Sequence, residues 1–173
     1  MTLGSGDYWS QHGTHTLLLL SPVVAFALVG LVSDVRSLLR GRRIDPAVTL
    51  AAAAAVAAAG VHVAVCPEHY QEGWLYGAFF TVTAGAQLLW AALLVLRPDP
   101  RVVRAGLVAS LAVVSLWAVT RSVGIPLGPE RGAIEQVGVL DVIATAAELV
   151  AAAACVWVLS RSARQDDRRA VAE

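Results

Sequence analysis

Long runs of apolar residues alternate along this chain with short polar or charged segments. Five of the runs approach or exceed the roughly 20 residues that an α-helix needs to cross a bilayer. They cover about residues 16–33, 46–65, 73–96, 102–120 and 137–159. The pattern therefore predicts an all-α integral membrane bundle of five transmembrane helices within residues 1–160, followed by a polar, Arg-rich tail at 161–173.

The composition agrees with a membrane location. Of the 173 residues, 57% are hydrophobic and only 15% are charged, which is too apolar for an ordinary soluble domain. The sequence contains no nucleotide-binding, serine-hydrolase or zinc-finger motif, and the helices leave no room for a soluble catalytic domain. The expected partner is the lipid bilayer of the plasma membrane, with either a second copy of the chain or another membrane subunit. No nucleic acid is expected.

The distribution of arginine predicts the orientation of the helices. The chain has 13 basic residues, all of them Arg, and 11 lie in three segments that a five-helix topology places on one side. Basic residues are enriched in cytoplasmic loops, so the N-terminus is expected outside and the C-terminus in the cytoplasm. The 11 residues are Arg36, Arg40, Arg42, Arg43, Arg97, Arg101, Arg104, Arg161, Arg164, Arg168 and Arg169.

All four histidines fall on the opposite, extracytoplasmic side in this topology. His12 and His15 belong to the N-terminal tail, whereas His62 and His69 flank the predicted turn between the second and third helices. Pro67 suits the first turn of a helix, so the third helix is expected to begin there and to extend above the membrane. One face of it would then carry residues spaced three or four apart, namely His69, Glu72, Tyr76, Phe80, Thr83 and Gln87.

A metal site is the first hypothesis that these residues support. His62, His69 and Glu72 would converge if the second and third helices turned their polar faces inward, and Asp141 of the fifth helix would lie within reach. Two imidazoles with one or two carboxylates are suitable ligands for a transition metal ion such as Cu, Zn, Fe or Mn. The alternative is an ordinary pair of interfacial histidines beside solvated glutamates.

Carboxyl groups within the fifth apolar run are the strongest single signal in the sequence. Asp141, Thr145 and Glu148 share one face of the predicted helix, and Glu148 lies about 16 Å from its outer end. An ionised group at that depth is costly unless it is paired or hydrated. Arg121, on a face with Ser110, Val114 and Trp117, is the expected partner of Asp141. Glu148 is expected to be protonated, to bond Gln87 or Thr145, or to contact a polar cavity.

Two segments, HVAVCPEHYQEGWLYGAFF at 62–80 and WAVTRSVGIPLGPE at 117–130, give the chain a resemblance to a known group. It resembles uncharacterised small polytopic membrane proteins of high-GC Gram-positive bacteria over about residues 61–148. The resemblance implies no activity.

Three functional hypotheses follow, and enzymatic activity stays open. The first is a protein that binds or handles a transition metal at the extracytoplasmic side. The second is a proton- or ion-coupled carrier that uses Asp141 and Glu148. The third is a non-catalytic accessory or scaffold subunit whose buried charges only specify how the helices pack.

Overall fold

The computed structural model describes residues 24, 27–37, 41 and 44–172, which form only helices and their connections. α2 spans Pro46–Glu72, α3 Trp74–Leu96, α4 Pro100–Ser122 and α5 Val139–Ala172, and a helical segment at 27–37 precedes them. All four labelled helices are long and apolar enough to cross a membrane. The chain therefore folds as a multi-pass helical membrane protein, as the apolar runs predict.

The first predicted span, 16–33, lies largely outside the described residues, as do His12 and His15. The other four predicted spans coincide with α2 to α5. α5 continues as a helix through the Arg-rich segment after residue 160, so this part of the predicted tail extends the last span by about three turns.

Two Asp-Pro pairs explain where α2 and α4 begin. Pro46 and Pro100 occupy first-turn positions, where a missing N–H group leaves no hydrogen bond unmade. Asp45 Oδ1 accepts a hydrogen bond from the backbone N–H of Ala47 at 2.8 Å, and Asp99 Oδ1 accepts one from Arg101 at 2.7 Å. Each pair thus caps the orphan amides of its helix and fixes the direction in which the chain enters it.

The turn between α2 and α3 corrects one prediction. α2 continues through Pro67 to Glu72, and the helix breaks at Gly73, whose backbone is extended. Proline is tolerated inside membrane helices because neighbouring groups satisfy the carbonyl that it leaves free. The third helix therefore does not begin at Pro67, and His69 and Glu72 belong to α2 rather than to the polar face of α3.

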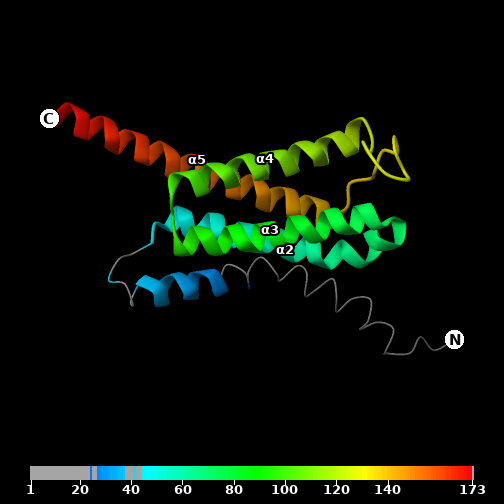
Figure 1. The fold of residues 1–173 in the computed structure, drawn as a ribbon, viewed down its shortest axis with the longest axis horizontal. Helices are drawn as coiled ribbons and strands as arrows, with labels where there is room; N and C mark the ends of the chain where they lie inside the picture. Colours follow the sequence, from blue (N-terminus) through cyan, green and yellow to red (C-terminus); the bar gives the residue numbers. More distant parts are fainter. Residues whose placement is uncertain (1–23, 25–26, 38–40, 42–43, 173) are drawn as a thin grey trace.

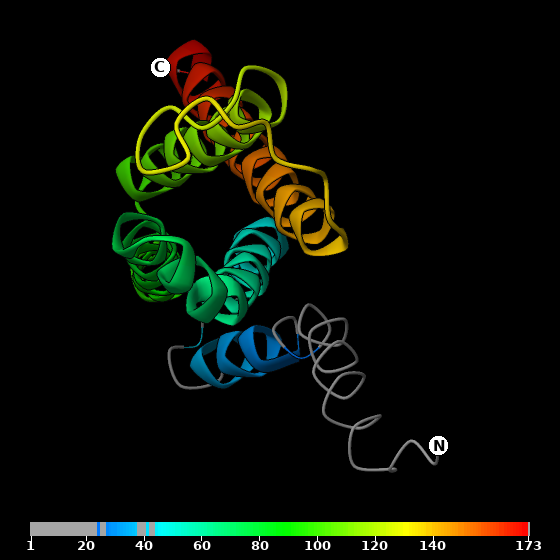
Figure 2. The ribbon, with the colours of Figure 1, turned by 90° about the vertical axis from the view of Figure 1, so that its right-hand side faces the viewer.

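The four long helices run alternately up and down and surround a common axis (Figures 1 and 2). α2 packs against both α3 and α5, and α5 packs against α4, whereas α3 and α4 make few direct contacts. α2 is the most buried helix, and the alanines in its middle let its neighbours approach closely. Its buried alanines are Ala51, Ala52, Ala53, Ala54, Ala55, Ala57, Ala58 and Ala59.

One end of the bundle is tightly packed, and we call it the arginine end. Here α3 and α4 do meet: the Trp90 ring lies over Gly106, where an added Cβ would come within 1.8 Å of it, and its Nε1 donates to the Val102 carbonyl at 2.8 Å. Arg36 donates to the Leu96 carbonyl at 2.7 Å at the same end. The fully buried Leu94, Val103 and Cys155 belong to the core cluster of this end.

We expect the arginine end to face the cytoplasm, because the segments that carry most of the arginines gather there. A green fluorescent protein fused after Glu173 should fluoresce, and alkaline phosphatase fused before Met1 or after Glu130 should be active outside. The reverse pattern would place the opposite end of the bundle, with its histidines, in the cytoplasm.

Candidate functional site

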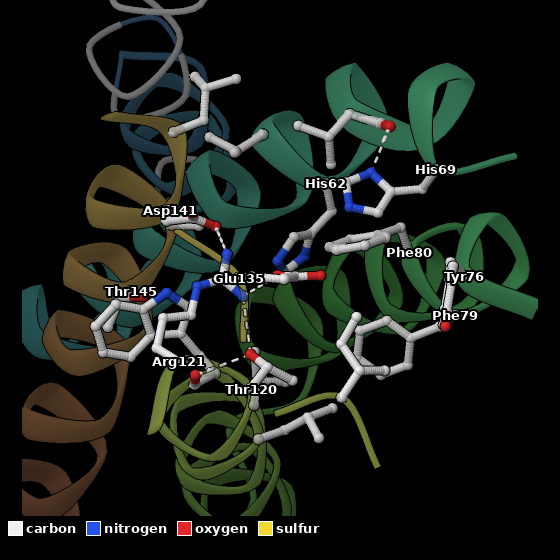
Figure 3. A pocket seen from close by; sticks show the side chains of 18 of the residues that line it. His62, His69, Tyr76, Phe79, Phe80, Thr120, Arg121, Glu135, Asp141 and Thr145 are labelled. Carbon is white, nitrogen blue, oxygen red and sulfur yellow. Dashed lines mark hydrogen bonds and ion pairs between the residues drawn. The ribbon is translucent and has the colours of Figure 1, made fainter. Parts of the chain in front are cut away.

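At the end opposite the arginine end, the four helices separate around a cavity of about 320 Å³. Its wall is largely aliphatic and aromatic, and the chemically active side chains come from every side (Figure 3). A volume of this size is near the lower limit for small-molecule pockets, which span roughly 300–1,000 Å³. The polar or charged residues that line it are His62, His69, Tyr76, Thr120, Arg121, Glu135, Asp141, Thr145 and Glu148.

The connection between α4 and α5 covers part of this cavity. Ile125 and the following Pro126 and Leu127 line it, and Ile125 exchanges backbone hydrogen bonds of 2.9 Å with the stretch at 132–133. The Tyr76 hydroxyl of α3 accepts a hydrogen bond from the Glu130 amide at 3.0 Å. Gly128 has a φ of +101°, and a Cβ there would lie 2.5 Å from the Tyr76 hydroxyl. Glycine thus permits the connection to rest on α3.

Arg121 holds two carboxylates together at one side of the cavity. Its Nη2 lies 2.7 Å from Asp141 Oδ1, and its Nη1 pairs with Glu135. Figure 3 shows the guanidinium between the two. Asp141 also accepts a hydrogen bond from the Gly138 amide at 2.8 Å and so caps the start of α5. The predicted pair of Arg121 and Asp141 is confirmed, and Glu135 is an additional partner.

A second polar group lies deeper in the bundle, around Glu148. This residue is only 3% exposed, and its carboxyl group accepts a hydrogen bond from Gln87 Nε2 of α3. Ser110 of α4 also hydrogen-bonds to Glu148. The expected contact with Gln87 is therefore confirmed. Thr145 lines the same cavity, but it makes no hydrogen bond to Glu148 in the described structure.

Gln87 connects Glu148 to a histidine of α2. The Gln87 amide nitrogen donates to the carboxyl group, so its oxygen faces His62 Nδ1, 2.9 Å away. An amide oxygen can only accept, so Nδ1 carries the hydrogen, and Nε2 of the neutral ring is left as an acceptor. His62, Gln87 and Glu148 thus form one hydrogen-bonded chain across α2, α3 and α5, which we call the buried relay.

The predicted metal ligands are not assembled into one group. Phe80 packs against both imidazoles, with ring centroids 4.1 Å from His69 and 5.6 Å from His62. His69 Nδ1 donates to a backbone carbonyl, its Nε2 lies 3.9 Å from Glu72, and Asp141 is paired with arginine. Among the described residues, no three His, Cys, Asp or Glu side chains are placed to hold a metal ion.

No family model, curated protein sequence or solved structure matches the chain. The cavity and its side chains are therefore what a functional proposal has to explain.

Two residues of the site were missing from the predicted contacts. Ser110 shares a helix face with Arg121, and this spacing was the signal that could have placed it beside Glu148. Glu135 lies in a non-helical connection, where no periodicity indicates which way a side chain turns. Its acidic charge, 14 residues after an arginine near a helix end, was the one available clue.

Proposed function

We propose that this protein is a proton-linked carrier that binds a small molecule in the cavity and exchanges a proton at Glu148. The observation that carries the proposal is the position of this carboxyl group: it is buried among four helices, it lines the cavity, and it is hydrogen-bonded from two sides. Ionisable residues inside the membrane generally belong to transport pathways or proton relays.

The wall of the cavity fits a small organic molecule better than a bare metal ion. Most lining residues are apolar, with a few hydrogen-bonding groups at defined places, which is the usual composition of a ligand pocket. The buried relay supplies an imidazole acceptor and a carboxyl group on one wall. The metal hypothesis draws on the same histidines, but the aromatic contact to both rings and the Arg121 pair with Asp141 favour ligand binding.

The two acidic groups of the original carrier hypothesis have different roles in this proposal. Asp141 is committed to Arg121 and to the start of α5, so it holds the cavity in shape. Glu148 has only neutral hydrogen-bonding partners and is the group that exchanges the proton. The titratable or charged groups that share the cavity with it are His62, His69, Tyr76, Arg121, Glu135 and Asp141.

The proposal further implies an oligomer. Four or five helices provide little surface for alternating access, so a carrier of this size is expected to work as a homo-oligomer or with a second membrane subunit. Exposed apolar side chains on the outer faces of the helices, those of α5 among them, are available for such contacts.

Infrared difference spectroscopy in lipid nanodiscs tests the proton site without knowledge of the ligand. Wild-type protein should show the carbonyl stretch of a protonated carboxylic acid, since ionisation in this position is costly. Glu148→Gln should lose that band. Asp141→Asn is the matched control and should retain it, because Asp141 is an ion-paired carboxylate. A band that is absent from the wild type, or unchanged in Glu148→Gln, would contradict the proposed function.

A further inference from the structure

We infer that the ligand of the cavity is a small lipophilic cation, such as an amine or a quaternary ammonium compound, which reaches the cavity from the lipid between α3 and α4. This inference rests on the proposed function and names the chemistry of its ligand. It combines three independent features of the site, namely its charge, its aromatic rings and the way in which two of its helices separate.

Three carboxyl groups and a single guanidinium group of the described residues line the cavity. Glu135, Asp141 and Glu148 line it, and among the described lining residues Arg121 is the one basic side chain besides the two histidines. Arg121 pairs with the first two of these carboxylates, which leaves their cluster with a net negative charge. Low-dielectric walls strengthen the attraction of such a cluster for a cation. An anionic ligand would meet repulsion from this cluster, in which two carboxylates share one guanidinium group.

Aromatic side chains line the same cavity. Phe79 and Phe80 come from α3, and Trp117 comes from α4, where it lies one turn before Arg121. The negative faces of such rings attract ammonium groups by about 0.5–2 kcal/mol each, most strongly where water is excluded. A cation that carries its own apolar groups would therefore use both the rings and the carboxyl groups.

Few direct contacts join α3 and α4, the two helices that flank one side of the cavity. α3 and α4 are joined by a short connection and meet around Trp90 and Gly106 at the arginine end, yet they make few contacts elsewhere. Phe79 of α3 lines the cavity and is 39% exposed. The α4–α5 connection meanwhile rests on Tyr76 and covers the cavity from the aqueous side. A lipid-soluble molecule thus has the more direct path.

On binding, the ammonium group of the ligand would replace the proton on the Glu148 carboxyl group. The O–H bond of the carboxyl group breaks, the carboxylate keeps the electron pair, and the proton passes to water. The ammonium group of the ligand then neutralises the carboxylate. The Gln87 amide nitrogen, which already donates to this carboxyl group, is placed to donate to the carboxylate as well.

Two probe molecules of the same shape, one a cation and the other neutral, provide a direct test. Benzyltrimethylammonium and its neutral isostere neopentylbenzene differ only in a nitrogen that replaces a carbon. Equilibrium dialysis against protein-loaded and empty nanodiscs should show protein-dependent binding of the cation and much weaker binding of the isostere. Glu148→Gln should weaken binding of the cation about tenfold, which corresponds to about 1.4 kcal/mol, and should leave the isostere unaffected. The exposed Glu130→Gln is the matched control and should behave as wild type.

A pH-sensitive dye in weakly buffered solution provides the second measurement. Wild-type protein should release about one proton per bound cation at the carboxyl group, and Glu148→Gln should release none. Equal binding of both probes would overturn the inference while leaving the cavity as a ligand site. Undiminished cation binding by Glu148→Gln, or no binding of either probe, would also overturn it, and the infrared band would then decide the proposed function separately.

Discussion

Replacement of Arg121 by leucine should lower the free energy of unfolding by about 1–3 kcal/mol, because removing one partner of a partly buried ion pair leaves the other charge uncompensated. Here two carboxylates lose their partner at once, since the guanidinium contacts both Glu135 and Asp141. Arg121→Lys should recover only part of the loss, because an ammonium group cannot reproduce the fork of two N–H groups. Denaturant unfolding in detergent micelles provides the measurement.

Two further variants identify the origin of this effect. Arg131→Leu removes an exposed arginine of the α4–α5 connection and should change stability by less than about 0.5 kcal/mol. Combining Arg121→Leu with Glu135→Gln and Asp141→Asn should restore most of the lost stability, because no buried charge then remains unpaired. If Arg121→Leu were as stable as the Arg131 variant, the cluster would not hold the fold together.

Introduction of a positive charge at position 148 should be at least as damaging. A lysine near the middle of a membrane helix costs about 2.5–3.5 kcal/mol on insertion scales, and its ammonium group cannot accept the hydrogen bond from Gln87. Glu148→Gln keeps an acceptor oxygen and nearly the same shape, so it should fold almost normally. Expression level and thermal stability in nanodiscs would report both variants.

Glu130→Lys is the control for Glu148→Lys, because Glu130 is exposed in the α4–α5 connection. It should have little effect on folding. A Glu148→Lys protein as stable as Glu130→Lys would show that the carboxyl position is open to water, and the argument for a buried proton site would fail.

The positions of the helices were predictable because they follow from the length of the apolar runs in the sequence. Four of the five predicted spans coincide with observed helices within a few residues, apart from the ends of α2 and α5. The error at α2 has a physical origin: Pro67 can start a helix or be tolerated inside one, and the sequence does not distinguish the two. The single extended residue Gly73 marks the real boundary.

The sequence predicts which helix faces carry the residues of the site, but it does not predict which of these residues contact one another across helices. The faces with Arg121 on α4 and Glu148 on α5 do turn toward the cavity, since a spacing of three or four residues determines a face. Which residues meet across helices depends on their axial register, and the error at Pro67 shifted that register. The contact of His62 with Gln87 and the position of Phe80 could not be derived for this reason, whereas Glu135 lies in a connection that has no helical periodicity.

The alanine surface of α2 has a consequence for how the protein is made. The helices that cover α2 most extensively, α3 and α5, follow it along the chain, so α2 is synthesised before its partners exist. Alanine methyl groups offer little to lipid tails, and only the one-residue turn at Gly73 separates α2 from α3. Insertion of the two as a helical hairpin would give α2 its first neighbour at the moment it enters the bilayer. The other side of α2 is closed only when α5, which follows α3 and α4 along the chain, packs against it.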